Sequence, residues 1–330
     1  MHRNNPGEQI DSLANLLGPE RRLEVQRIAK RLLIAGVIAA GPIYLLAVRA
    51  EGIKEIAGVV VLMAILFGLP AYFIVVAGPT VWRERVVAAG LPAACRAEGF
   101  DQLEQEPSSA SGPLAVADGL GLLPDYNTID VAIGLTGTLD GVPIQLFDLT
   151  LVRTGGTGRR LVFKGLLISF DLPSTTRITA AVHPTPGLTR RALRWLGTIV
   201  GNRQTESVAQ DDVYTVRSDD AERANTWITS AVLTAMADLG RAQGRHLDRT
   251  TFASIVSGLL TRDMPAKAVT GGLQDGNFYL AIDRRAALVR VPNPITAPRS
   301  PSPLLRQWER QITQVLEPVR EMRTTNLFHA

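Results

Sequence analysis

The chain has few of the residues that build covalent, metal or redox sites. Its 330 residues include one cysteine, Cys95, so no disulfide can form within it. Its four histidines are not spaced as metal ligands, and no serine lies in a Gly-x-Ser-x-Gly turn. We therefore expect no metal, no cofactor and no catalytic residues, and we expect Cys95 to fill an apolar position of a helix.

Charge is missing from two long stretches, Leu32–Val48 and Ile56–Val76, which a short polar turn connects. Two buried core helices would usually show about 10–14 apolar residues and a polar stripe. The second stretch has apolar residues all round and is longer than that. At about 1.5 Å per residue the first stretch is roughly 26 Å long, near the lower limit for a bilayer core. The sequence predicts a transmembrane helical hairpin over residues 32–77.

Basic residues flank both stretches, whereas the turn between them has only Arg49 and Lys54. The positive-inside rule then predicts an inner-membrane protein with both termini and the remaining chain in the cytoplasm. Anionic lipid would attract these flanking basic residues. Because they also account for the pI of about 9.5, we expect the bilayer, and no nucleic acid, as a partner. The flanking residues are Arg21, Arg22, Arg27, Lys30, Arg31, Arg83 and Arg85.

Composition divides the rest of the chain into segments. Residues 1–31 predict two short amphipathic helices around Gly18-Pro19, which lie on the membrane or pack on the soluble domain. Residues 78–112 predict a juxtamembrane helix followed by a linker, and residues 113–295 a soluble domain. Residues 296–330 predict a Pro-rich linker and a C-terminal helix with apolar positions at Leu305, Trp308, Ile312, Val315 and Val319, which Pro318 ends or kinks near its last turn.

Alternating apolar residues predict an antiparallel meander of about four strands within the soluble domain. The first strand lies around residues 129–135, and Asp140-Gly141 predicts a hairpin turn. The return strand and the third strand change phase near Phe147 and Gly165, which predicts a β-bulge at each. The fourth strand covers residues 178–183.

A helix and a second hairpin complete the predicted domain. Asp219, with Glu222 three residues on, predicts a helix start, and Gln274-Asp-Gly276 predicts a turn between strands 266–273 and 277–283. The fold class is therefore α+β: a two-helix transmembrane hairpin, then a cytoplasmic domain with an antiparallel meander, a packed helix and a second hairpin.

Three motifs in this order resemble an uncharacterised bacterial membrane-protein family, catalogued as domain of unknown function three-one-three-seven. They are Phe163-Lys-Gly-Leu-Leu167, Val213-Tyr-Thr-Val-Arg-Ser-Asp-Asp220 and Asp275-Gly-Asn-Phe-Tyr-Leu-Ala-Ile282, and the resemblance covers roughly Leu32 to Pro294. It implies two N-terminal spans and a cytoplasmic α+β domain. It supplies no activity and no catalytic residues.

One group of residues is a candidate ligand site. Lys164 lies in an otherwise apolar strand, and Asp171 and His183 are expected on the same face of the sheet. Such a face could bind an anionic ligand, such as a lipid headgroup or phosphopeptide. The alternative is that Lys164 is a charge on an edge strand that deters aggregation.

These observations favour a membrane-anchored cytoplasmic binding or scaffolding protein, with a protein partner or a second copy of the chain as its target. The alternative is a membrane-bound enzyme that acts on a lipid or peptide, with a site assembled from residues distant in sequence. We expect binding rather than catalysis because no acid, base or nucleophile constellation is evident.

Overall fold

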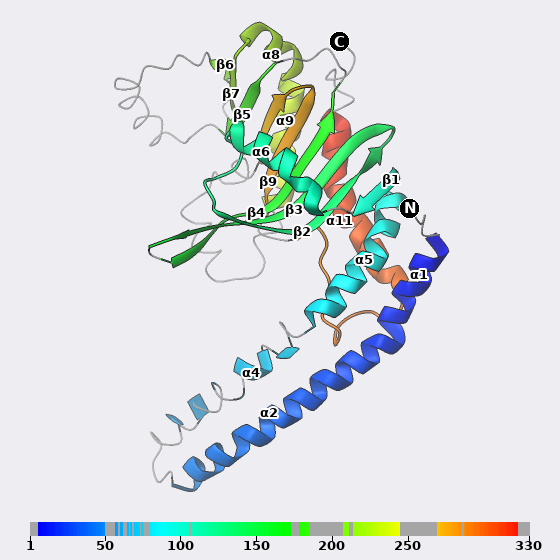
Figure 1. The fold of residues 1–330 in the computed structure, drawn as a ribbon, viewed down its shortest axis with the longest axis vertical. Helices are drawn as coiled ribbons and strands as arrows, with labels where there is room; N and C mark the ends of the chain where they lie inside the picture. The colour runs from blue at the N-terminus through cyan, green and yellow to red at the C-terminus, as the bar shows by residue number, and fades with distance from the viewer. Residues whose placement is uncertain are drawn as a thin grey trace. The chain divides into compact units, whose positions relative to one another are not determined.

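A computed structural model describes residues 6–49, 57–58, 60–61, 65, 67, 69–72, 74–75, 79–105, 107–156, 158–172, 178–184, 207–210, 214–244, 269–284 and 287–322. The chain divides into two compact units. A helical unit comprises Met1–Cys95 and Arg290–Glu309, and a sheet unit comprises Arg96–Val289 and Arg310–Ala330. Figure 1 shows the helices of the first and the strands of the second.

The helical unit contains α1 (Pro6–Asn15), η1 (Leu16–Glu20), α2 (Arg21–Arg49), α4 (Leu69–Tyr72), α5 (Thr80–Ala97) and the start of α11 (Pro301–Met322). The predicted break at Gly18-Pro19 is wrong. The chain passes through these residues in a π-helical turn, and α2 continues as one helix of 29 residues. A π-turn widens the helix by one residue, which accommodates the missing N–H of Pro19 without ending it.

Close packing around Gly90 joins three helices of this unit. A Cβ on Gly90 would lie 2.8 Å from the Trp308 ring of α11 and 3.1 Å from Leu13 of α1. The Trp82 indole of α5 donates a hydrogen bond of 3.2 Å to the carbonyl of Leu16. The N-terminal segment therefore packs on α5 and α11.

The helix predicted after the second uncharged stretch forms as α5, and Cys95 is fully buried in it, as predicted. Within the ranges that the structure describes, no helix combines the length and the apolar character that a membrane crossing requires. The polar turn 50–56 and much of the second uncharged stretch lie outside those ranges. The transmembrane hairpin stays a prediction.

The sheet unit is an α+β fold built on one antiparallel sheet, which has nine strands in the described residues. Their order is β1-β2-β3-β4-β9-β8-β5-β7-β6. Both predicted Asp-Gly turns are present, with positive φ at Asp140, Gly141, Asp275 and Gly276. The strands are β1 (Phe100–Gln105), β2 (Thr128–Leu139), β3 (Val142–Gly155), β4 (Gly158–Asp171), β5 (Ala180–Pro184), β6 (Ser207–Gln210), β7 (Tyr214–Ser218), β8 (Val269–Gln274) and β9 (Asn277–Asp283).

The predicted meander holds for β2, β3 and β4, and the predicted fourth strand forms as β5, but β5 does not lie beside β4. The β8–β9 hairpin lies between β4 and β5, so β4 pairs with β9 over seven residues. The Phe170 and Phe278 rings, 5.3 Å apart, lie on adjacent strands of this pairing. Apolar contact between strands about a hundred residues apart in sequence outweighs the local preference for neighbouring strands.

The predicted bulges are also misplaced. The register shifts once in β2, around Ala132, and once in β4, around Val162, whereas Phe147 and Gly165 pair regularly. The phase changes arise because both faces of the central strands are buried, so apolar residues need not alternate. Gly165 serves a different purpose: a Cβ there would lie 1.8 Å from the carbonyl oxygen of Ile282, so glycine permits the approach of β9.

The segment predicted as a linker is structured. It contains the end of β1, a 3₁₀ turn at Pro107–Ala110 and the first residues of α6 (Ser111–Gly119). β1 pairs with β2 through Phe100–Gln105, which places it at the edge of the sheet. The Pro-Ser-Ser run begins a helical segment rather than a flexible connection, since Pro, Ser and Gly are also common at helix starts.

The helix after β7 begins one residue later than predicted. Asp220, not Asp219, is the N-cap of α8 (Ala221–Trp227), and its carboxylate accepts a hydrogen bond of 3.1 Å from the Arg223 backbone. α9 (Ser230–Gly244) follows after a break at residues 228–229. Asp219 instead accepts a hydrogen bond from the Thr179 backbone, which joins β5 to the end of β7.

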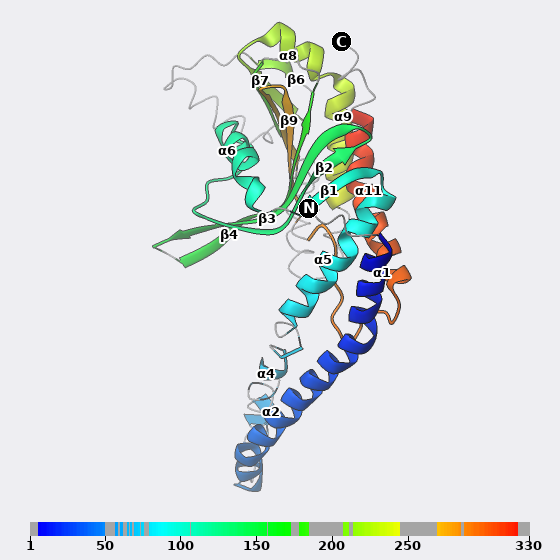
Figure 2. The same cartoon turned by 45° about the vertical axis from the view of Figure 1, so that its right-hand side comes forward.

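The two faces of the sheet are covered by different helices. Figure 2 shows α6 on one face, and α9 and α11 on the other. Leu114 and Ala117 of α6 pack in a cluster with Phe147 and Leu149, which defines the α6 face. Met236 of α9 reaches the opposite, α9 face near Gly271. Helix α11 continues four residues past Pro318 to Met322, and its buried positions begin at Leu304, one residue before the predicted Leu305.

Candidate functional site

The α6 face changes from apolar to polar along the strands. Beneath α6, neighbouring strands present Phe147, Leu167 and Ala281, all buried. Two residues further along each strand the same face carries polar side chains. Those positions are Gln145 on β3, Ser169 on β4 and Tyr279 on β9. Helix α6 packs in one cluster with the apolar rows and with Tyr279, and its first residues lie beside the polar rows.

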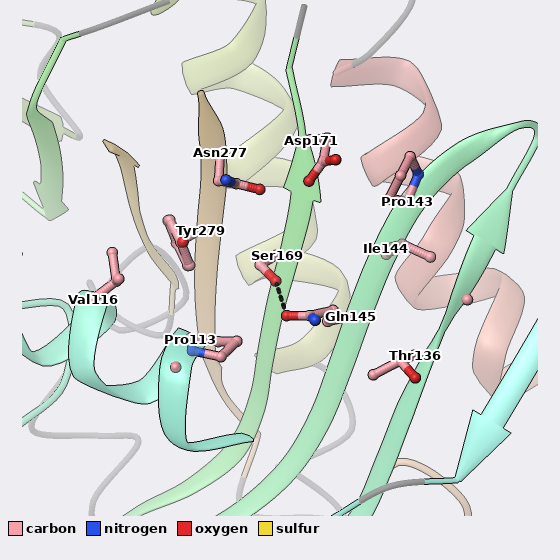
Figure 3. A pocket seen from close by; sticks show the side chains of 12 residues that line it. Pro113, Val116, Thr136, Pro143, Ile144, Gln145, Ser169, Asp171, Asn277 and Tyr279 are labelled. Carbon is pink, nitrogen blue, oxygen red and sulfur yellow. Dashed lines mark hydrogen bonds between the residues drawn. The ribbon is translucent and has the colours of Figure 1, made fainter. Parts of the chain in front are cut away.

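A groove of about 540 Å³ lies over these polar rows (Figure 3). Its floor is formed by β2, β3, β4 and β9, and one side by the first residues of α6. Three of the lining residues come from α6: Gly112, Pro113 and Val116. The others are Thr136, Gly137, Pro143, Ile144, Gln145, Ser169, Asp171, Asn277 and Tyr279.

The polar floor is a row of side chains in exact cross-strand register. Thr136 pairs with Gln145, Gln145 with Ser169, and Ser169 with Tyr279. The Ser169 hydroxyl donates to the Gln145 side-chain oxygen at 3.2 Å, as the dashed line in Figure 3 marks. Since neighbouring strands lie about 4.8 Å apart, the row offers hydroxyl and amide groups at regular intervals across the sheet.

The groove is acidic. Asp171 lies at its end on the next row, opposite Asn277, and partial burial raises the pKa of its carboxyl group. Burial raises the pKa of the Tyr279 phenol, and the negative charges of Asp275 and Asp171 raise it further. The lining that the structure describes includes no Lys, Arg or His. Elsewhere in the described residues, no three His, Cys, Asp or Glu side chains gather as metal ligands.

The structure separates the three predicted ligand-binding residues. Lys164 and Asp171 lie seven residues apart on β4 with regular register between them, so they occupy opposite faces. His183 on β5 lies on the α6 face with Asp171, near Gly121, but three strands from β4. The expectation of one shared face is therefore not met. Period-two alternation predicts opposite faces for an odd separation, and the assumed bulge at Gly165 had obscured it.

Lys164 instead lies near a buried charged pair on the α9 face. Asp148 and Arg284 are only 2% and 7% exposed. The Leu288 backbone donates to the Asp148 carboxylate at 2.5 Å. Burial raises the Asp148 pKa to about 6, although this hydrogen bond, Arg284 and Lys164 act in the opposite direction. Asp148 could have been noticed in the sequence as the charged residue between Phe147 and Leu149.

Two of the predicted flanking arginines make structural contacts in the helical unit. Arg21 donates to the carbonyl oxygens of Pro294, at 2.7 Å, and Ile295, at 3.1 Å. Arg85 forms an ion pair of 2.7 Å with Glu20. Arg83 is half-buried. Arg22, Arg27, Lys30 and Arg31 are exposed, as Arg85 is, and Arg27 pairs with Glu24 at 3.1 Å.

The comparisons with known proteins add little to this description. No family model matches the chain. Among solved structures, the chain is similar to the mycobacterial trehalose monomycolate transport factor A, with a TM-score of 0.31 and 9% sequence identity. The match covers 69% of this chain and 96% of that one. A TM-score at this level supports no conclusion about fold or function, and membership of the family that the motifs resemble stays a prediction.

Proposed function

We propose that this chain is a membrane-anchored binding or scaffolding protein. The observation that carries the proposal is the apolar surface of α2 beyond its charged first turns. Leu33, Val37, Ile38 and Tyr44 are 68–70% exposed, on a stretch without a charged residue. Complete burial of a Leu, Val or Ile side chain lowers the free energy by roughly 1.5–3 kcal/mol relative to leaving it in water. Exposed apolar surface of this extent is typical of contact with lipid or a protein partner.

A helical hairpin within the helical unit fits the two uncharged stretches. The described residues of the second stretch are helical, and α4 contacts α2. A Cβ on Gly36 of α2 would lie 3.4 Å from the Phe67 ring, which brings the two stretches side by side. Glycine at such a contact lets two helices approach closely, as in membrane helix pairs. Exposed apolar residues continue along the second stretch at Val60, Val61 and Ile65.

The exposed basic residues of α2 support the orientation. Arg22, Lys30 and Arg31 precede the apolar part of the helix and are exposed. In the proposal they lie at the cytoplasmic surface of the inner membrane, where anionic lipid attracts them. Both termini and the sheet domain are then cytoplasmic, and the protein belongs to the two-span family that its motifs resemble. The target of the sheet domain is a protein partner or a second copy.

Fractionation of cells that express the full chain tests the proposal. We expect the protein in the membrane pellet after an alkaline carbonate wash, and in the supernatant only after detergent is added. A full-length protein that stays in the supernatant of a detergent-free lysate as a monodisperse species would overturn the anchoring. Protease added to intact spheroplasts should leave the sheet domain uncut, and cleavage there would contradict the orientation.

A further inference from the structure

The groove contains polar groups without a side-chain partner among the residues that the structure describes. Tyr279 is 7% exposed, and its ring packs under α6 while its hydroxyl reaches the groove. Among the residues that the structure describes, neither this hydroxyl nor the Asp171 carboxylate has a hydrogen-bond or ion-pair partner. Side chains held at a pocket by a rigid sheet, with their polar ends unpaired, are arranged as ligand contacts.

The negative charge at the groove favours a ligand with a positive charge. Asp171 lines it, Asp275 lies close enough to act on Tyr279, and no cationic side chain lines the described part. An anion would meet repulsion there with no donor of positive charge. A guanidinium or ammonium group would instead neutralise Asp171, and an arginine could bind the carboxylate through two parallel hydrogen bonds.

The remaining lining groups match a peptide backbone. Thr136, Gln145 and Asn277 offer hydroxyl and amide groups, which can both donate and accept hydrogen bonds. A peptide backbone needs such mixed partners, whereas a simple cation needs acceptors alone. Pro113 and Val116 supply an apolar wall along which the aliphatic part of a Lys or Arg side chain can pack.

We propose that the groove binds an extended segment of a partner protein and that a Lys or Arg side chain of this segment pairs with Asp171. The inference rests on the proposed binding function and specifies the site and the chemistry of its target. Gln145, Asn277 and Tyr279 contact the backbone of the bound segment, and α6 forms one wall of the site.

Ligand-observed saturation-transfer NMR on the full-length protein in an uncharged detergent tests this inference. The probe is the tripeptide acetyl-Ala-Arg-Ala-amide, and its matched control is the same tripeptide with citrulline, which has the shape of arginine without the charge. We expect saturable binding of the arginine peptide and at least about tenfold weaker binding of the citrulline peptide. Asp171→Asn should weaken arginine-peptide binding about tenfold. Asp125→Asn, which removes an exposed carboxylate outside the groove, should leave it unchanged.

Three outcomes would overturn the inference: no saturable binding of the arginine peptide, equal binding of both peptides, or insensitivity to Asp171→Asn. Saturable binding of glucose or maltose that Asp171→Asn abolishes, without peptide binding, would assign the groove to carbohydrate instead. Membrane sedimentation of the wild type and of Asp171→Asn is measured separately. Loss of the wild type from the membrane would contradict the anchoring alone, because the peptide measurement does not depend on it.

Discussion

The sheet unit buries the types of apolar side chain that helix α2 of the helical unit exposes. In the sheet unit, Leu149 and Leu167 are fully buried between the sheet and α6. In the helical unit, Leu33 and Ile38 of α2 are 69% and 70% exposed. Residues of equal hydrophobicity are thus removed from solvent in one unit and presented to it in the other. The proposed anchoring accounts for this difference, with water around the sheet and lipid around α2.

The largest effect is expected on the stability of the sheet unit, when Gly165 is replaced. Gly165→Ala places a methyl group where the Ile282 carbonyl lies, 1.8 Å away, so β4 and β9 must separate. We expect a loss of more than about 3 kcal/mol in the free energy of unfolding. Urea denaturation followed by circular dichroism measures it. Gly155→Ala is the control, because its Cβ would meet no atom within 4 Å. Equal stability of the two variants would contradict the tight β4–β9 approach.

A charge placed on α2 tests whether this helix is surrounded by lipid or by water. Ile38→Arg should cost about 2.5–3.5 kcal/mol of membrane insertion if this position lies near the centre of a bilayer, but under about 0.5 kcal/mol on a surface in water. The measurement is the fraction of protein that sediments with membranes. Leu161→Arg, at a position 52% exposed on the sheet, should sediment as the wild type does. If Ile38→Arg also sediments as the wild type, α2 does not depend on lipid.

The buried Asp148 predicts an unusual pH dependence in the sheet unit. Its folded pKa is raised to about 6 from 3.8, so the folded state holds the proton more tightly than the unfolded chain. Its contribution to stability is greatest below the ordinary value and is lost as the pH rises through about 6, by an amount on the order of 3 kcal/mol. Urea unfolding between pH 4 and 7 should show this fall in the wild type and not in Asp148→Asn. Parallel pH profiles would contradict it.

The smallest effect is expected at the Arg85–Glu20 ion pair of the helical unit. Both side chains are more than a third exposed, so solvent screens the pair despite its distance of 2.7 Å. Arg85→Gln should lower the unfolding free energy by less than about 1 kcal/mol. A loss of unfolding free energy as large as that of Gly165→Ala would contradict this and show that the ion pair holds α5 against η1.

The sequence predicted the features that local chemistry decides. The Asp-Gly turns at 140–141 and 275–276 formed as expected because these residues tolerate positive φ. The strand predicted around residues 129–135 from alternation lies within β2, and the strand predicted at 277–283 after the Asp-Gly turn matches β9. Features that depend on distant contacts were missed. The position of β9 beside β4 and the regular register at Phe147 depend on what covers each face, which a strand's own residues do not specify.

Of the three residues predicted to form one ligand site, only Asp171 lies at the groove, and its role in binding stays a prediction. Asp171 lines the groove, whereas Lys164 lies on the other face and His183 lies three strands away. The signal that was available is the change to polar residues at every second position, from Leu167 to Ser169 to Asp171. It becomes a site only because Gln145 and Tyr279 fall in the same row, and cross-strand register cannot be read from one strand alone.

Spin-label accessibility in lipid vesicles tests the central contrast most directly. One label is attached at Ile38→Cys and another at Leu161→Cys, and the native Cys95 is buried and should remain unlabelled. Two paramagnetic reagents are compared, oxygen, which concentrates in hydrocarbon, and a nickel chelate, which stays in water. The account predicts that oxygen relaxes the label at position 38 more strongly and that the nickel chelate relaxes the label at position 161 more strongly. A label at position 38 that meets the nickel chelate as often as the label at position 161 would contradict it.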